Sequence, residues 1–432
     1  MKRRQFLVGA GLGLGAAPLF ACGAGPLASK PPTAGAAGSW GEIKDQFDLA
    51  PGLSHFAGFF LASHPRVVRE AIEAHRRGLD ANAYLYIEEN VARLEMGVRQ
   101  AAAEYLGASA DDLAMTDSTT MGLGVVYGGL KLGPGQEILS TTHDHIVTTL
   151  ACSQRAERTG APFRQVRLYD DPAQASAGAI VERLVRELRP ETRIIAVTWV
   201  HSGTGVKLPI RAMADALARA NASRADGDRA ILCVDGVHGF GIEDVAVGDL
   251  GCDFFIAGCH KWLFGPRGTG LVWARPSAWP VTAPTIPSMD PLWRTGRPEA
   301  MPPAAFMTPG GFHSFEHRWA LEAAFRFSLG IGKARIAARV HELNLHLRQE
   351  LSRMRRVAVA TPLAEELSAG IVCFSVDGVP PPEVVARLHE RKIVASVTPP
   401  FYDPPYARLA AGLYTVESDV EAALAAVRAI AA

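Results

Sequence analysis

Short apolar runs and longer stretches of helical periodicity alternate along the chain from about residue 112 onward. The runs IIAVTWV at 194–200 and AILCV at 230–234 are apolar throughout, which is typical of strands covered on both faces of a parallel sheet. The pattern predicts strands at 112–116, 137–141, 163–168, 193–200, 230–235, 253–257 and 269–274. We therefore expect an α/β fold with a mostly parallel seven-stranded sheet, whose binding residues lie at the carboxyl ends of the strands.

Helical periodicity predicts helices between these strands and again after a proline-rich passage at 276–309. The expected helices are 147–158, 179–188, 210–222, 315–329 and 332–354, followed by a strand at 371–376 and a helix at 382–392. The change of pattern predicts a large domain at 40–300 and a smaller α+β domain at 301–432.

The first 22 residues, MKRRQFLVGAGLGLGAAPLFAC, join a basic start to a glycine-rich apolar stretch that is too short for a comfortable transmembrane helix. The pair Arg3-Arg4 resembles a twin-arginine export signal, a system that moves folded proteins; an ordinary secretion signal is the alternative. Cys22 resembles the lipidated cysteine of a lipoprotein, and plain cleavage after Ala21 would serve equally. Residues 23–39 are rich in Gly, Ala and Pro, which predicts a flexible linker. We expect a periplasmic protein, or one anchored to the outer side of the inner membrane through Cys22.

The composition indicates a packed globular enzyme rather than a nucleic-acid-binding or disulfide-stabilised protein. Apolar residues make up 48% of the 432, and the 44 basic side chains balance the 44 acidic ones. A neutral chain without a basic run has little to offer a phosphate backbone. Five cysteines follow the signal without a CxxC pair, so we expect free, mostly buried thiols: Cys152, Cys233, Cys252, Cys259 and Cys373.

The most informative chemistry lies in the segment LCVDGVHGFGIEDVAVGDLGCDFFIAGCHKWLFGPRGTG at 232–270. It places Asp235 at the end of a predicted strand and Lys261 just after another. Pyridoxal phosphate requires a lysine amine to condense with its aldehyde and a carboxylate to keep its ring nitrogen protonated. A surface lysine and a helix-capping aspartate would be the ordinary alternative, and spacing alone does not exclude it.

This segment resembles the class V aminotransferase family of pyridoxal phosphate enzymes, especially its isopenicillin N epimerase-like members. VDGVHGFG and CHKWLFGPRGTG carry the likeness, which extends over about residues 55–425. The resemblance implies the fold-type I architecture, a homodimer and pyridoxal 5'-phosphate as cofactor. It also implies that Lys261 is the Schiff-base lysine, Asp235 the partner of the pyridine nitrogen and His238 a neighbour of the ring hydroxyl.

A cofactor phosphate would find a cradle at residues 118–120. Ser118, Thr119 and Thr120 precede an apolar helix, whose free amides and neighbouring hydroxyls attract an anion. Capping alone would also explain the segment. It resembles the family's Gly-Thr-Thr phosphate loop, with Ser118 in place of the glycine.

Other positions acquire roles from the same resemblance. His145, in the pair Asp-His after a predicted strand, resembles the histidine that stacks on the cofactor ring, with His143 as a competitor. Arg408 resembles the arginine that binds a substrate α-carboxylate, a task suited to a planar guanidinium. HFAGFFLASHPRVVREA resembles the family's N-terminal substrate loop, so Ser63 and His64 are expected to face the substrate.

Three departures from the family pattern matter. Trp199 stands where relatives carry an Asn or His near the ring hydroxyl, and Gly258 where some carry a phosphate-binding serine. We expect His260 or the 118–120 loop to bind more of the phosphate instead. No cysteine lies between Lys392 and Arg408, where a desulfurase needs its nucleophilic thiol, so cysteine desulfurase activity is disfavoured.

No metal site is predicted. His341 and His346 are five apart rather than the four of a zincin helix, and His313 and His317 lack an evident third ligand.

The sequence therefore predicts an exported enzyme that acts on an amino acid or on an amino-acid unit of a peptide-like metabolite such as a siderophore-like peptide. Transamination, epimerisation, elimination and decarboxylation stay open, and a C–S lyase is an alternative of the same kind. The alternative from a different class is a catalytically degenerate lipoprotein that uses the same fold as a binding scaffold.

Overall fold

The computed structural model describes residues 38–294 and 301–432, all within one compact unit. The predicted export signal with Cys22, and all of the predicted linker except its last two residues, lie outside the described residues. Within the part of the chain that is described, no helix has the length and apolar character needed to cross a membrane.

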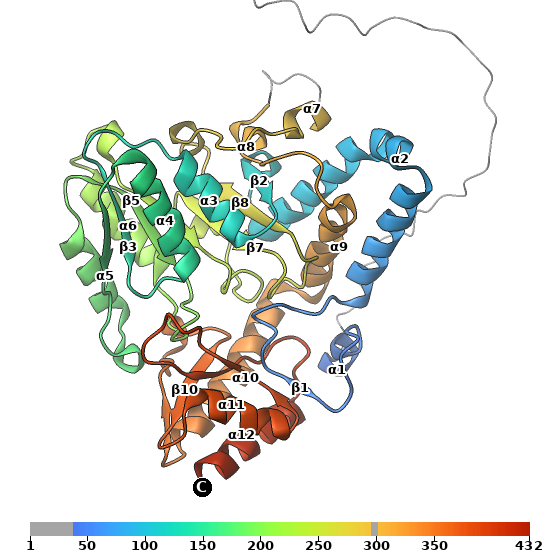
Figure 1. Ribbon diagram of the computed structural model, residues 1–432, viewed down its shortest axis with the longest axis vertical. Helices are drawn as coiled ribbons and strands as arrows, with labels where there is room; N and C mark the ends of the chain where they lie inside the picture. The colour runs from blue at the N-terminus through green and yellow to red at the C-terminus, as the bar shows by residue number, and fades with distance from the viewer. Residues whose placement is uncertain (1–37, 295–300) are drawn as a thin grey trace, which may run out of the picture. The chain divides into compact units, whose positions relative to one another are not determined.

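A seven-stranded sheet forms the centre of the fold, as predicted (Figure 1). Its strands are β2 (Leu113–Thr116), β3 (Glu137–Thr141), β4 (Phe163–Val166), β5 (Thr192–Thr198), β6 (Ile231–Asp235), β7 (Phe254–Gly258) and β8 (Gly270–Ala274). Their order is β2-β8-β7-β6-β5-β3-β4, and β8 alone runs against its neighbours. Each predicted strand and helix is present, with ends that differ from expectation by no more than two residues.

Alternate residues of the strands point into two separate apolar layers, one on each face of the sheet. In β5, Ile194 and Ala196 belong to the layer under α3 (Thr119–Gly129) and α4 (Ile146–Thr159), whereas Ile195 and Val197 face the opposite layer. That opposite layer contains residues of α5 (Ala177–Glu187) and α6 (Ile210–Asn221). A strand whose two faces are both buried favours apolar residues at successive positions, which is why the central residues of β5 lack polar alternation.

A long helix that the sequence pattern did not predict, α2 (Arg66–Leu106), packs along α9 (Phe315–Ile331). It bends at Asn82, whose backbone is extended and whose Oδ1 accepts the N–H of Leu85, as at a helix N-terminus. Its buried residues gather almost entirely from Val91 onward, so the first half offers no apolar face for periodicity to reveal.

A smaller antiparallel sheet follows in the C-terminal part (lower region of Figure 1). Its order is β12-β13-β10-β9, built from Ser396–Val397, Ala407–Leu409, Val372–Val376 and Val357–Val359. The helices α10 (Lys333–Ser352), α11 (Pro381–Glu390) and α12 (Glu417–Ala431) pack with it around a second apolar core. The remaining elements are α1 (Trp40–Lys44), β1 (Ser54–His55), α7 (Asp290–Arg294), α8 (Pro303–Phe306) and β11 (Ile393–Val394).

The predicted boundary at residue 300 stays a prediction. Leu321 and Phe325 of α9, beyond that boundary, lie in the same apolar layer as Val98 of α2 and Leu232 of β6.

Candidate active site

Polar residues gather where the parallel strands end. Ser118 follows β2, His145 follows β3, Ser202 follows β5, Asp235 ends β6 and Lys261 follows β7. Because parallel strands end at one edge of the sheet, the topology brings these five positions together.

Lys261 and Asp235 form the charged pair at the centre of this edge. Burial lowers the pKa of the Lys261 amine to about 8, although the charge of Asp235 opposes the shift. Burial likewise raises the pKa of Asp235 to about 6, against the hydrogen bond that its Oδ1 accepts from the N–H of Val237 at 3.2 Å. The pKa values of both groups therefore lie close to neutral pH, where each group can gain or lose a proton.

His238 is buried next to the lysine, with its Nε2 3.3 Å from the Nζ of Lys261. Its Nδ1 accepts the indole N–H of Trp262 at 3.4 Å. The sequence predicted that His238 lies near the site, and in the structure its Nε2 lies within hydrogen-bond distance of the Lys261 amine.

The expected phosphate cradle lies at the N-terminus of α3. The Oγ of Ser118 caps the helix by accepting the N–H of Met121. Thr119 is buried and its Oγ1 accepts the N–H of Gly258 at 2.8 Å, so its own proton is free to be donated. Thr120 is exposed, and His260 donates from Nδ1 to the carbonyl of Thr269 at 3.4 Å.

The structure explains the glycine at 258. A Cβ there would lie 2.9 Å from both Thr119 Oγ1 and His260 Cε1. A serine on this backbone would displace the two side chains that are expected to bind phosphate. Glycine instead allows the threonine hydroxyl to approach the end of β7.

Of the two competing histidines, His145 faces the site and His143 does not. His143 stacks on Tyr169, with 3.8 Å between ring centroids, and its Nε2 accepts the N–H of Leu168. Burial and then the charges of Lys261 and Arg408 lower the pKa of His145 to about 4.

Arg408 is buried on β13, an inner strand of the small sheet between β12 and β10. Its guanidinium donates to the carbonyls of Ser202 at 3.0 Å and Val397 at 2.8 Å, and it lies 4.7 Å from the ring centroid of Phe59. Within the described residues its Nε has no hydrogen-bond partner. The group is thus oriented by backbone carbonyls while it keeps donors for an anion.

The N-terminal loop runs beside the site, and the expected contact of Ser63 and His64 with a substrate stays a prediction. The N–H of Ala62 donates to the carbonyl of His260, so the loop that holds Ser63 and His64 is attached beside the lysine. His64 is buried, and burial, followed by the charges of Arg267, His317 and Arg69, lowers its pKa to about 4.

Three residues of the site were missed by the sequence reasoning. Phe59 lies between the Arg408 guanidinium and the rings of His238 and Trp262. Ser202 and Tyr402 share a hydrogen bond of 3.1 Å between their hydroxyls. Only the long-range packing of the loops reveals these contacts.

The departure at Trp199 has a simple physical cause. Successive side chains of a strand point to opposite faces, and the Trp199 ring lies on the α6 face, where it contacts Phe255 and the backbone at Gly239. The ring is therefore part of the core, and Ser202 is the polar side chain that this loop places beside Arg408 and Tyr402.

The four histidines considered as metal ligands contact carboxylates or a carbonyl. His341 contacts Glu243, His346 contacts Glu421 and His313 contacts Glu95, while His317 donates from Nδ1 to the carbonyl of Arg267. Across the described ranges no three His, Cys, Asp or Glu side chains converge in a way that would hold a metal ion.

A groove of about 670 Å³ lies at the opposite edge of the sheet, at the amino ends of the parallel strands. Its charged side chains are partly paired with one another, Arg211 with Asp215 and Arg275 with Asp253. It shares no residue with the site at the carboxyl edge.

Pyridoxal 5'-phosphate fits the residues at the carboxyl edge. Lys261 supplies an amine of lowered pKa, and Asp235 supplies a buried carboxylate for a protonated ring nitrogen. The N-terminus of α3 supplies amides and the Thr119 hydroxyl for a phosphate.

Comparison with known proteins agrees with this geometry. The aminotransferase class-V family matches residues 62–399. Isopenicillin N epimerase of Streptomyces clavuligerus is 28% identical over 89% of this chain and 97% of that protein. A probable cysteine desulfurase of Halalkalibacterium halodurans is 25% identical over 75% of this chain and 78% of that protein.

A solved structure shows the same fold. The cystine C-S lyase C-DES, in complex with its reaction product cysteine persulfide, superposes with a TM-score of 0.78 at 23% identity, over 88% of this chain and 98% of that one. The match over residues 62–399, together with the lysine, the carboxylate and the helix N-terminus at one edge of the sheet, shows that this chain belongs to the class V aminotransferase family of pyridoxal phosphate enzymes.

Proposed function

We propose that this protein is an exported enzyme that moves the α-proton of an amino acid, or of an amino-acid unit in a peptide-like metabolite such as a siderophore-like peptide. The similarity to isopenicillin N epimerase, which covers 89% of this chain, supports epimerase-type chemistry. Epimerisation and transamination are the two outcomes that we favour.

One observation carries the proposal: Phe59 and His238 connect the Arg408 guanidinium to the Lys261 amine. The guanidinium lies 4.7 Å from the centroid of the Phe59 ring, that ring lies 5.8 Å from the His238 ring, and His238 Nε2 lies 3.3 Å from Lys261 Nζ. The charges of Lys261 and Arg408 both lower the pKa of His145, and both lower that of His238. The two cations therefore lie close enough to the same two histidines for their charges to lower the pKa values of both rings.

Four groups have separate roles in the proposed reaction. Arg408 would bind the α-carboxylate and so fix the substrate's orientation. Bound pyridoxal 5'-phosphate supplies the electron withdrawal that acidifies the α-carbon. Lys261, with a pKa of about 8, would take and return that proton at its Nζ. Asp235 would stabilise positive charge on the ring nitrogen.

Desulfurase chemistry stays disfavoured despite the desulfurase relatives. The loop between β12 and β13 carries Phe401 and Tyr402 and no cysteine. Cys373 lies on β10, fully buried, and burial raises the pKa of its thiol to about 12. A thiol in that state is a poor nucleophile.

The proposal includes a homodimer and export. Large apolar side chains such as Phe60, Tyr84 and Phe312 are more than 70% exposed, which is typical of a surface that another chain covers. The Arg3-Arg4 pair supports export of the folded, cofactor-loaded protein.

The test is exchange of the α-proton in D₂O. The purified protein, loaded with pyridoxal 5'-phosphate, is incubated with L- and D-amino acids and short peptides, and the α-proton signals are followed by NMR. Deuterium incorporation together with inversion of configuration at the α-carbon would identify a racemase or epimerase. Formation of the substrate's 2-oxo acid, with a second 2-oxo acid added as amino acceptor, would identify an aminotransferase.

Two variants control this experiment. Lys261→Ala should lose both exchange and the yellow cofactor absorbance. Arg408→Lys should keep the absorbance but raise KM for carboxylate substrates. Sulfide or persulfide from cysteine or cystine would point to C–S cleavage instead, and a wild-type protein that stays colourless with added cofactor would favour the binding scaffold.

A further inference from the structure

The environment of His238 determines which of its two nitrogens carries the proton. An indole N–H donates and never accepts. Trp262 Nε1 lies 3.4 Å from His238 Nδ1, so that nitrogen must be the unprotonated one. A neutral His238 then carries its proton on Nε2, which faces the Lys261 amine at 3.3 Å.

His238 stays neutral chiefly because it is buried. Burial is the main cause of a pKa well below the usual histidine value, and the charges of Lys261, Arg408 and His145, when they are protonated, lower it further. A second proton on this ring would be removed from water and would lie near the Arg408 guanidinium, which stays charged. The ring is therefore a neutral imidazole whose tautomer is set by its neighbour.

The indole is held by segments far apart in sequence. A Cβ at Gly370 would lie 2.7 Å from Trp262 Cη2, and a Cβ at Gly241 would lie 2.6 Å from the backbone carbonyl carbon of Trp262. Phe59 stacks on the indole face, with 6.3 Å between centroids and 25° between planes. Trp262 is 3% exposed, so its ring has no room to turn its N–H away from His238.

We propose that Trp262 is a positioning residue that fixes His238 as the Nε2–H tautomer, so that the imidazole donates to the lone pair of an uncharged Lys261 amine. A protonated Lys261 would place its own N–H donors opposite the Nε2–H donor of His238, and no hydrogen bond could form between them. This arrangement disfavours the charged form of Lys261. This inference rests on the proposed function only in taking Lys261 as the reacting amine.

The experiment reads the tautomer directly, by long-range ¹H–¹⁵N NMR of histidine side chains in the intact protein before and after loading with pyridoxal 5'-phosphate. His238→Gln assigns the signals. In the wild type we expect an unprotonated Nδ1 and a protonated Nε2. Trp262→Phe keeps an aromatic ring but removes the donor, and should produce a mixture of tautomers.

A second readout is the pH at which the apo-protein amine begins to react with pyridoxal 5'-phosphate. Trp262→Phe should move that midpoint upward by about half to one unit, the shift that corresponds to one lost hydrogen bond. Gly370→Ala tests the same link in another way, because it keeps the indole N–H and displaces the ring; it should change the tautomer in the same direction.

Each outcome decides the proposal whether or not the enzyme assignment is correct. A wild-type His238 protonated on Nδ1 would overturn it, as would a Trp262→Phe protein, folded by circular dichroism, that keeps both the tautomer and the midpoint. Failure of α-proton exchange with the expected tautomer present would contradict the proposed function and leave this inference standing.

Discussion

Single residues at the carboxyl edge of the sheet are held in charge states that differ from those of exposed groups. Lys261 is the clearest example, since burial outweighs the attraction of Asp235 and leaves the amine with a pKa of about 8. A free lysine side chain, with a pKa near 10.4, is almost fully protonated at that pH.

The first prediction follows from this difference. Below about pH 8 the amine is protonated and unreactive, and above it the amine is free, so the rate of reaction with pyridoxal 5'-phosphate should rise through pH 8 and then level off. The rate is measured as the appearance of cofactor absorbance in apo-protein between pH 6 and pH 10. N-acetyl-lysine is the control, with its rise near pH 10; a protein midpoint near that value would contradict the prediction.

The second prediction concerns Gly258. Substitution by serine, the residue of some relatives, should weaken cofactor binding, because the new Cβ would lie 2.9 Å from Thr119 Oγ1 and His260 Cε1. We expect a cost of about 1–3 kcal/mol, typical of an overpacked site. Cofactor affinity is measured by absorbance titration and unfolding by urea.

Gly124→Ala is the matched control. This glycine lies on the exposed side of α3, the helix whose Thr119 contacts Gly258, and no atom lies within 4 Å of a new Cβ there. Alanine should leave the affinity unchanged and stabilise the helix slightly. Unchanged cofactor affinity in the Gly258→Ser protein would show that the loops adjust freely.

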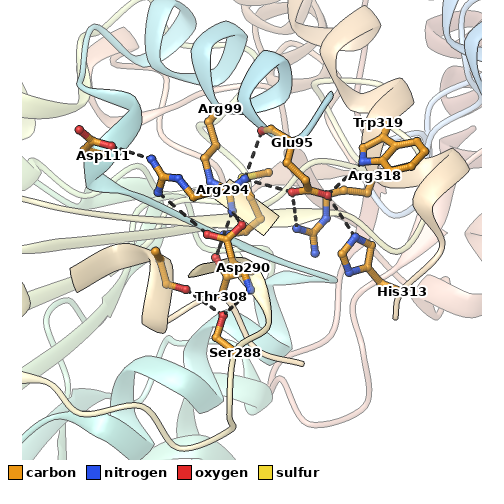
Figure 2. Close-up of polar contacts among 12 residues, drawn as sticks. Glu95, Arg99, Asp111, Ser288, Asp290, Arg294, Thr308, His313, Arg318 and Trp319 are labelled. Atoms are coloured by element: carbon orange, nitrogen blue, oxygen red, sulfur yellow. Dashed lines mark hydrogen bonds and ion pairs between the residues drawn. The ribbon is translucent and has the colours of Figure 1, made fainter. Parts of the chain in front are cut away.

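At the scale of elements, a buried ion network joins α2, α7 and α9 (Figure 2). Glu95 of α2 accepts hydrogen bonds from Arg99 at 3.0 Å and from the Trp319 indole at 3.1 Å, with Arg318 at 3.7 Å. Arg99 also donates to Asp290 at 2.6 Å. Burial alone would raise the pKa of Glu95, but Arg318, His313 and Arg99 together hold it below its usual range.

The network also reaches the cofactor side of the fold. Arg318 lies 3.6 Å from Asp117, the residue before the Ser118 cap of α3. The packing of α9 on α2 is therefore connected to the start of the phosphate cradle.

The third prediction is that Glu95→Ala destabilises the fold strongly. Removal of this carboxylate leaves Arg99 and Arg318 buried with fewer partners, at a cost of about 3–5 kcal/mol. The measurement is urea unfolding at pH 7. Because the pKa of Glu95 is depressed in the folded state, its contribution is present above the unfolded value near 4.5 and is lost as the pH falls further.

Glu104→Ala on the same helix provides the comparison. Glu104 pairs with Arg326 at the surface, where it is more than half exposed, so its loss should cost less than about 1 kcal/mol. Equal effects of the two substitutions would show that the buried network contributes no more than a surface pair.

At the scale of the whole molecule, the proposed export route requires the fold and the cofactor to be complete before transport. The fourth prediction is that Arg3→Lys combined with Arg4→Lys retains the protein in the cytoplasm, because the twin-arginine route reads that pair. Fractionation of a bacterial host with an antibody to the mature chain measures the distribution.

Lys2→Gln is the control, since it reduces the basic charge and leaves the arginine pair intact. Normal export of the double variant would instead favour an ordinary secretion signal. A mass shift at the mature N-terminus would decide whether Cys22 carries lipid.

The sequence by itself determined the large sheet and the central chemistry. The inner strands β5 to β8 were predicted because their central residues are apolar on both faces, a pattern that can be read without any knowledge of the neighbouring strands. Lys261 and Asp235 were predicted as site residues because the contiguous motifs that hold them resemble those of the family and lie next to strand ends, where the topology of the sheet brings side chains together.

Tertiary structure decided what depends on contacts between distant segments. The first half of α2 has no apolar stripe, so its helix was not predicted. Phe59, Ser202 and Tyr402 reach Arg408 or one another across more than 100 residues of chain. The same holds for which side of a loop faces the site and for the tautomer of His238, which depends on its contact with Trp262. The pKa values of Lys261 and Asp235 depend on burial and on charges from other segments. A linear pattern of residues shows neither the burial nor the neighbouring charges.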